Sequence, residues 1–125
     1  ADRAQRIHKL LSRKMKWTVD ELQTIQTDVF LNSGFDIKDK LCTTLNKFEN
    51  SLSSFEISIL NSLNQWDGNM KTSSVGATIF QFSMYHIMKE ALQPTLGKEY
   101  FRLYLKYIIP LSLINNLDII KFLNK

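Results

Sequence analysis

The sequence predicts an all-α fold, an irregular bundle of about six helices around a buried helix at residues 74–93. Only 4 Gly and 2 Pro occur among the 125 residues, which is little material for the many turns of an all-β protein. Apolar residues recur at intervals of three and four along most of the chain. Within 75–92 they fall on nearly every side of a helix, a pattern typical of a buried helix.

The length and composition suit one helical domain. A 125-residue chain with 44% hydrophobic and 22% charged residues is long enough to bury a core, so we expect residues 1–125 to form a single domain. The chain begins with Ala rather than Met, and we expect it to be a piece of a larger protein. The single cysteine, Cys42, cannot form an internal disulfide, and its neighbour Leu41 favours a buried thiol.

The first helix is predicted at residues 2–15, with Asp2 as its cap. Ile7 and Leu10 lie on one narrow apolar stripe. Arg3 is one turn from Ile7 and two turns from Leu10, so the stripe includes it and we predict that it points inward. The alternative is a terminal arginine that swings into water.

The next three helices follow from capping and spacing. Thr18 and Glu21 form a capping box that begins the second helix. We expect this helix to end near Asn32-Ser33-Gly34, where Gly34 can adopt a left-handed C-terminal conformation. A third helix is predicted at about 36–48. Ser53-x-x-Glu56 begins the fourth, whose apolar stripe comprises Phe55, Ile59, Leu60, Leu63 and Trp66.

A turn at Asp67-Gly68 separates the fourth helix from the buried one. Side-chain oxygens at 72–74 can cap the buried helix, which should end by Gln93 because Pro94 disfavours helical geometry just before it. An amphipathic segment starts at Gly97, Pro110 should kink or end it, and a short helix at 113–123 is predicted to follow.

Three motifs, in order, carry a resemblance to a known family. They are Asp2-Arg3-Ala4-x-Arg6-Ile7-x-x-Leu10-Leu11, then Thr18-x-x-Glu21-Leu22-x-x-Ile25-Gln26-Thr27-Asp28-Val29, then Leu63-x-x-Trp66-Asp67-Gly68 with Ser74-x-x-Ala77-x-Ile79-Phe80. Together they cover most of residues 1–93, and in this order they resemble the penicillin amidase (penicillin acylase) family.

This resemblance implies an N-terminal-nucleophile hydrolase that cleaves a linear amide bond of an acylated small molecule. In such enzymes a serine freed by self-cleavage attacks the amide, and an asparagine and backbone N–H groups stabilise the oxyanion. Neither that serine nor that asparagine is expected within these 125 residues, so the segment alone should be inactive. The family's functional arginine corresponds to Arg3, in a supporting catalytic role. The partners implied are the remainder of the parent hydrolase and the amide substrate, with no cofactor. Relatives are commonly periplasmic or secreted, which does not fix the compartment of this chain.

The other chemistry-bearing residues favour structural roles. His8 and His86 have no second ligand three or four residues away, so no metal site is predicted. His86 is expected to be a hydrogen-bonded core histidine, Asp67 to bond nearby backbone N–H groups, and Trp66 to anchor the interior. Asp28 is a possible partner for a basic residue of the first helix.

Two alternatives come from charge. Six basic residues and one Asp in 1–17 allow a stand-alone basic binding module for nucleic acid or a protein partner, although the second helix opens with two acidic residues and a solvated basic face is commoner. A membrane-surface helix at 97–123 is the other alternative, interrupted by Pro110 and carrying Asp118. No apolar run approaches the ~18 residues that a membrane span needs, and we expect neither a membrane span nor nucleic-acid binding.

Overall fold

The computed structural model describes residues 2–107, and within this range it contains helices and no β-strand. The all-α prediction is confirmed. The elements are α1 (Asp2–Leu11), α2 (Val19–Gln26), α3 (Asn32–Asn46), the 3-10 turn η1 (Glu49–Ser51), α4 (Ser54–Asn64) and α5 (Val75–Tyr107).

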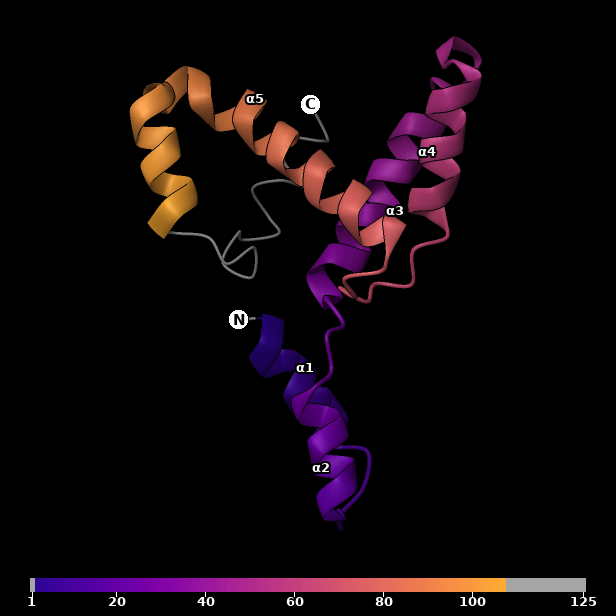
Figure 1. Ribbon diagram of the computed structural model, residues 1–125, viewed down its shortest axis with the longest axis vertical. Coiled ribbons are helices and arrows are strands. Elements are labelled where there is room, and N and C mark those ends of the chain that lie inside the picture. Colours follow the sequence, from indigo (N-terminus) through magenta and orange to yellow (C-terminus); the bar gives the residue numbers. More distant parts are fainter. Residues whose placement is uncertain (1, 108–125) are drawn as a thin grey trace.

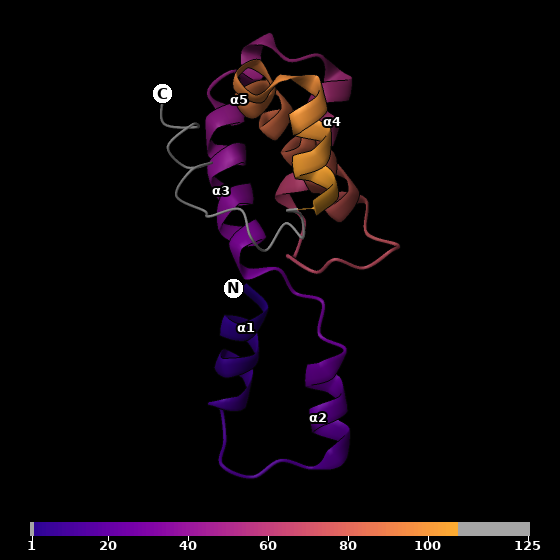
Figure 2. The same ribbon diagram turned by 90° about the vertical axis from the view of Figure 1, so that its left-hand side faces the viewer.

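The helices are arranged as a stem and two arms (Figures 1 and 2). The stem is the hairpin formed by α1 and α2, which projects from the rest of the molecule. The start of α1 and the end of α2 lie nearest to α3. α3 and α4 lie side by side in one arm. α5 packs against α4 at its beginning and then extends away as the other arm.

The core lies where α3, α4 and α5 meet. Phe80, Leu63 and Met84 are its largest fully buried side chains. The Trp66 ring stacks on Phe80 with centroids 4.7 Å apart. Cys42 is also buried, as predicted, and burial raises the pKa of its thiol above the usual value. The remaining members of this core are Ile37, Leu41, Leu60 and Ala77.

α5 supplies the centre of the core, but it buries one stripe rather than its whole circumference. Phe80 and Met84 are each 1% exposed, and Ala77 and Met88 lie on the same side. On the opposite side Val75 is 66% exposed and Phe82 67% exposed. Among residues 2–107, no other element covers this outer face of α5, which includes the apolar Val75 and Phe82.

The end of α5 differs from the prediction. The helix continues through Pro94, and its break is Gly97, whose φ of 78° is open to glycine and strained for other residues. The predicted stop at Gln93 is therefore too early. After Gly97 the second limb turns back, and the buried Phe101 lies 6.3 Å from the Tyr85 ring, centroid to centroid. Pro110 and the predicted helix at 113–123 lie outside the described residues.

Two further boundaries were placed wrongly from the sequence. α1 ends at Leu11, four residues early, and the segment 32–34, predicted to end the second helix, is instead the first turn of α3. Gly34 is buried there, where an added Cβ would lie 2.4 Å from Leu31 Cδ2. Its role is close packing rather than a left-handed cap.

The predicted caps of α2, α4 and α5 are present, whereas the prediction that Asp2 caps the first helix is wrong: Asp2 is the first residue of α1, and its carboxylate accepts N–H groups at the start of α3. Thr18 with Glu21, and Ser53 with Glu56, form complete capping boxes at α2 and α4. Ser74 Oγ accepts the N–H of Ala77 at 3.1 Å and so caps α5.

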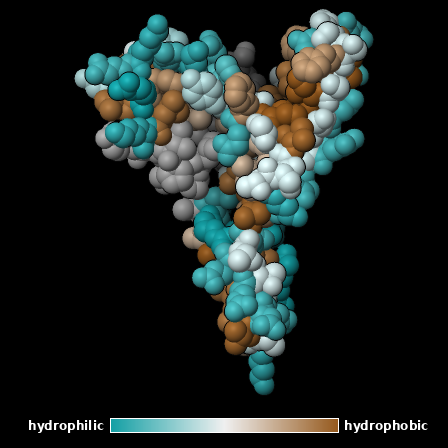
Figure 3. Space-filling model, in the orientation of Figure 1, coloured by the Kyte–Doolittle hydropathy of each residue, from teal (hydrophilic) through white to brown (hydrophobic). Residues whose placement is uncertain are grey.

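The predicted apolar stripe of α4 is only partly buried. Leu60, Leu63 and Trp66 are in the core, whereas Phe55 is 71% exposed and Ile59 is 36% exposed. Apolar surface is visible on the upper part of the α3–α4 arm in Figure 3. The core ends below this level because α5 leaves α4 before reaching it.

Candidate functional site

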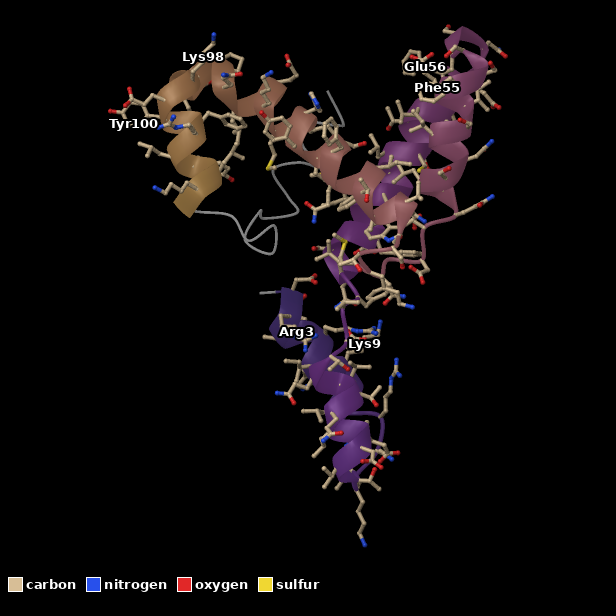
Figure 4. All side chains as sticks on the ribbon, in the orientation of Figure 1. Arg3, Lys9, Phe55, Glu56, Lys98 and Tyr100 are labelled. Atoms are coloured by element: carbon tan, nitrogen blue, oxygen red, sulfur yellow. The ribbon has the colours of Figure 1, made fainter. Side chains whose placement is uncertain are left out.

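Arg3 lies on the first turn of α1, at the junction of the stem with α3 (Figure 4). Its guanidinium donates three hydrogen bonds to backbone carbonyls at the C-terminal end of α2. Nη1 lies 2.5 Å from Asp28 O, and Nη2 lies 2.9 Å from Gln26 O and 3.1 Å from Ile25 O. The last carbonyls of a helix carry partial negative charge, so a cation is favoured there.

Arg3 thus differs from both sequence-based expectations. It lies on the side of α1 that faces α2, but its side chain remains 43% exposed. It does not swing freely into water either, because three carbonyls hold it. It is an anchored cation with part of its surface open.

Arg6, one turn further along α1, binds the carboxylate of Asp28 with both ends of its guanidinium fork. Nε is 3.0 Å from Oδ1 and Nη2 is 2.7 Å from Oδ2. The pair is well shielded, with side-chain exposures of 13% and 17%. The hydrogen bond from Arg6 lowers the pKa of Asp28, and the bond to Asp28 raises the pKa of Arg6. The pairing of Asp28 with a basic residue of the first helix is confirmed, and Arg6 is that residue.

Asp2 connects α1 to α3, the third helix that meets at this junction. Its carboxylate accepts the N–H groups of Asn32 at 3.2 Å and Ser33 at 2.8 Å, the first turn of α3. Asp2 is buried, at 8% exposure. Adjacent residues therefore bind opposite ends of two other helices, Asp2 the start of α3 and Arg3 the end of α2.

A cavity of about 300 Å³ lies between α1 and α2 beside this junction. Arg6 and Asp28 contribute to its wall together with the apolar Leu10 and Ile25. Arg13 and Glu21 add charges of opposite sign.

The Trp66-Asp67-Gly68 turn has the structural role expected of it. Asp67 accepts the N–H of Asn69 at 2.9 Å and its Nδ2 at 2.8 Å, which lowers the pKa of the Asp67 carboxyl. Trp66 is 4% exposed, and its Nε1 donates to Asn69 O at 2.9 Å.

The histidine prediction is wrong. His86 is exposed, with its ring 5.2 Å from that of Phe82, because it lies on the outer face of α5. Across residues 2–107 no three His, Cys, Asp or Glu side chains are grouped so as to hold a metal ion.

Sequence reasoning missed Lys38, which is 5% exposed. Its ammonium lies 2.9 Å from Asp39 Oδ1 and 4.2 Å from the centre of the Phe35 ring. It also lies 3.4 Å from the carbonyl of Asn64, the last residue of α4. No local spacing marked this lysine as a helix-end partner.

The basic stretch at the N-terminus is partly used inside the protein. Arg3 and Arg6 bind the 25–28 segment, and Lys14 forms a salt bridge with Glu21 and lies over the Trp17 ring. Three of the six basic residues that suggested a nucleic-acid module therefore form interactions within the α1–α2 hairpin. No helix within the described range is long and apolar enough to cross a membrane.

Comparison with known proteins gives one match. The family model described as Penicillin amidase matches residues 1–120, a range that includes all five described helices. No curated protein and no solved structure shows a significant match to the chain.

Proposed function

Because the chain belongs to the penicillin amidase family, we propose that it is the helical part of an N-terminal-nucleophile hydrolase that cleaves a linear amide bond of an acylated small molecule. The family match over residues 1–120 is the observation that carries this proposal. The serine nucleophile and the oxyanion-binding asparagine belong to another part of the parent protein. The serine's own α-amino group takes its proton during attack on the amide carbonyl.

Arg3 has the supporting catalytic role in this proposal. Its geometry suits it, since the guanidinium is fixed by carbonyls on one side and its side chain is 43% exposed. A fixed cation costs no reorganisation when negative charge develops on the amide oxygen, and such preorganised charges account for much of enzymatic rate acceleration.

The remainder of the parent hydrolase is the partner of this segment. The face of α5 that the described elements leave uncovered, with Val75 and Phe82, supports burial against it, since exposed apolar surface of this kind marks interaction sites.

The proposal is tested first in the coding region. It predicts a serine at a processing site upstream of Ala1 and an asparagine shortly before Ala1. The parent protein is then purified and assayed on phenylacetyl amides and on acyl-homoserine-type amides. Turnover of one of these classes is expected. A parent without the upstream serine, or without amidase activity on any acylated amine, would refute the assignment.

Arg3 is tested in the same parent by Arg3→Met. We expect kcat/KM to fall about 100-fold, the scale of losing one transition-state stabiliser. Arg102→Met is the matched control because Arg102 is an exposed arginine of α5 that does not line the cavity between α1 and α2. The 125-residue chain alone should show no turnover.

The stand-alone basic module remains the alternative function. Lys9 and Arg13 are both exposed and favour it. It predicts nucleic-acid or acidic-protein binding that weakens steeply with added salt. Absence of binding at low salt would remove it.

A further inference from the structure

Two cations share one carboxylate at the stem junction, and they share it unequally. We call Arg3, Arg6 and Asp28 the arginine–aspartate cluster. Arg6 makes both hydrogen bonds to the Asp28 carboxylate, at 3.0 and 2.7 Å. The nearest approach of Arg3 to the same carboxylate is 3.7 Å, from Nη1 to Oδ1. The carboxylate is therefore the partner of Arg6.

Arg3 is held by neutral groups instead. Its three hydrogen bonds go to the carbonyls of Ile25, Gln26 and Asp28. Carbonyl dipoles orient a guanidinium but cancel less of its charge than a carboxylate bound by both nitrogens would. Arg3 keeps a positive charge that is both fixed and partly exposed.

The position of Arg6 explains why the carboxylate does not turn to Arg3. The Arg6 guanidinium lies 4.4 Å from the centre of the Phe30 ring, which supports it from one side. The backbone N–H of Phe30 donates to Asp28 Oδ1 at 3.3 Å. Both carboxylate oxygens of Asp28 are thus occupied, and the segment is fixed with its main-chain carbonyl toward Arg3.

We propose that Arg6 is a positioning residue for Arg3: by occupying the carboxylate of Asp28, it keeps the charge of Arg3 available for the negative charge that develops on the amide oxygen of the substrate. The inference rests on the proposed role of Arg3 in hydrolysis and adds a second arginine that acts only through it. Arg6 need not touch the substrate.

Removing Arg6 has a specific consequence. In an Arg6→Met variant the shielded Asp28 carboxylate loses its partner, and Arg3 is the nearest remaining cation. A small rotation of Asp28 closes the 3.7 Å separation to a hydrogen bond. The charge of Arg3 is then neutralised by a full carboxylate. Removing that carboxylate as well, by Asp28→Asn, ends the competition and leaves the carbonyl contacts of Arg3 in place.

The experiment compares Arg6→Met with Arg6→Met/Asp28→Asn in the parent hydrolase. We expect Arg6→Met to lower kcat about tenfold, part of the loss for removing such a charge entirely, with a smaller change in KM. The double variant should recover most of this loss. A merely structural ion pair predicts no recovery, because both variants lack the pair. Equal kcat in the two variants, or no loss in Arg6→Met, would overturn the inference.

Controls separate this inference from the proposed function. Arg102→Met should keep the parent's kcat, because Arg102 is an exposed arginine of α5 outside the arginine–aspartate cluster and the cavity beside it. If Arg3→Met leaves kcat unchanged, the proposed role of Arg3 fails. If Arg3→Met lowers kcat but the double variant does not recover, only the role of Arg6 fails.

Should Arg6→Met not fold, Arg6→Lys takes its place, because it keeps a cation near Asp28 but loses the fork geometry. We then expect a smaller loss than tenfold, again reversed by Asp28→Asn, and no reversal would refute the inference.

Discussion

The Asp2 carboxylate lies 2.8 Å from the backbone nitrogen of Ser33, 31 residues away in the chain. It acts as the cap that α3 lacks locally, since Leu31 precedes the helix and offers no side-chain acceptor. Asp2→Ala should therefore destabilise the chain by about 1–2 kcal/mol, the usual cost of losing a helix cap. Urea denaturation measures this. A change no larger than that of Gln5→Ala, an exposed position on the same helix, would contradict the capping role.

Gly76 should not tolerate a side chain. An added Cβ would lie 2.5 Å from Trp66 Cβ and 3.1 Å from Ser62 O, atoms that cannot move away without shifting α4. Gly76→Ala gains about 1 kcal/mol of helix propensity, but overpacking of about 1–3 kcal/mol opposes it. We expect net destabilisation and a loss of the Trp66–Phe80 stacking, seen in near-UV circular dichroism. Thr78→Ala, at an exposed position in the same turn, is the control. Equal or higher stability of Gly76→Ala would show that the two helices can separate freely.

Two phenylalanines of α5 should respond very differently to truncation. Phe80 is 1% exposed and Phe82 is 67% exposed. Phe80→Ala should cost about 3–5 kcal/mol, because it leaves a cavity beside Trp66. Phe82→Ala should change the free energy of unfolding by less than about 0.5 kcal/mol in this chain. Thermal unfolding of the two variants compares them directly, and similar losses would contradict the one-sided burial of α5.

The stability of the stem should depend on pH through Glu21. Hydrogen bonds from Lys14 and from Thr18 lower the pKa of Glu21 from 4.5 to about 2. Its contribution to stability is therefore fully present above pH 4.5 and is lost as the pH falls toward 2. Denaturation midpoints of the native chain and of Glu21→Gln should differ most near pH 5 and converge near pH 2. Since the side chains of Lys14 and Glu21 are each about 40% exposed, added salt should reduce the difference between the two midpoints. A constant difference across this range would contradict the assignment.

Local sequence signals predicted local structure well. The capping boxes at Thr18 and Ser53 depend on residues three apart, and the Asp67 turn on residues two apart, so each could be read without knowing the fold. The start of α3 could not, because its cap comes from Asp2 at the other end of the stem. The same limit applies to Lys38, which binds the end of α4 across the core.

Apolar periodicity predicted which helix supplies the core but not how much of it is covered. Residues 75–92 are apolar on most sides, yet His86 and Phe82 are exposed because no described element packs on that face. For the candidate site, the apolar stripe of the first helix predicted that Arg3 points inward, and its side chain faces α2 but is 43% exposed. Its carbonyl partners and the preference of Asp28 for Arg6 depend on tertiary geometry that spacing does not encode.

The short bridge between Phe30 and Asn69 has a consequence for folding. Its two hydrogen bonds, from Leu31 N to Gly68 O and from Met70 N to Val29 O, join segments that flank the whole α3–α4 arm. Closing a loop of that length in an unfolded chain has a large entropic cost. Once α3 and α4 have paired, however, the start of α3 and the end of α4 already lie close together. We therefore expect the arm to form early and the bridge, with the stem attached to it, to form late in refolding.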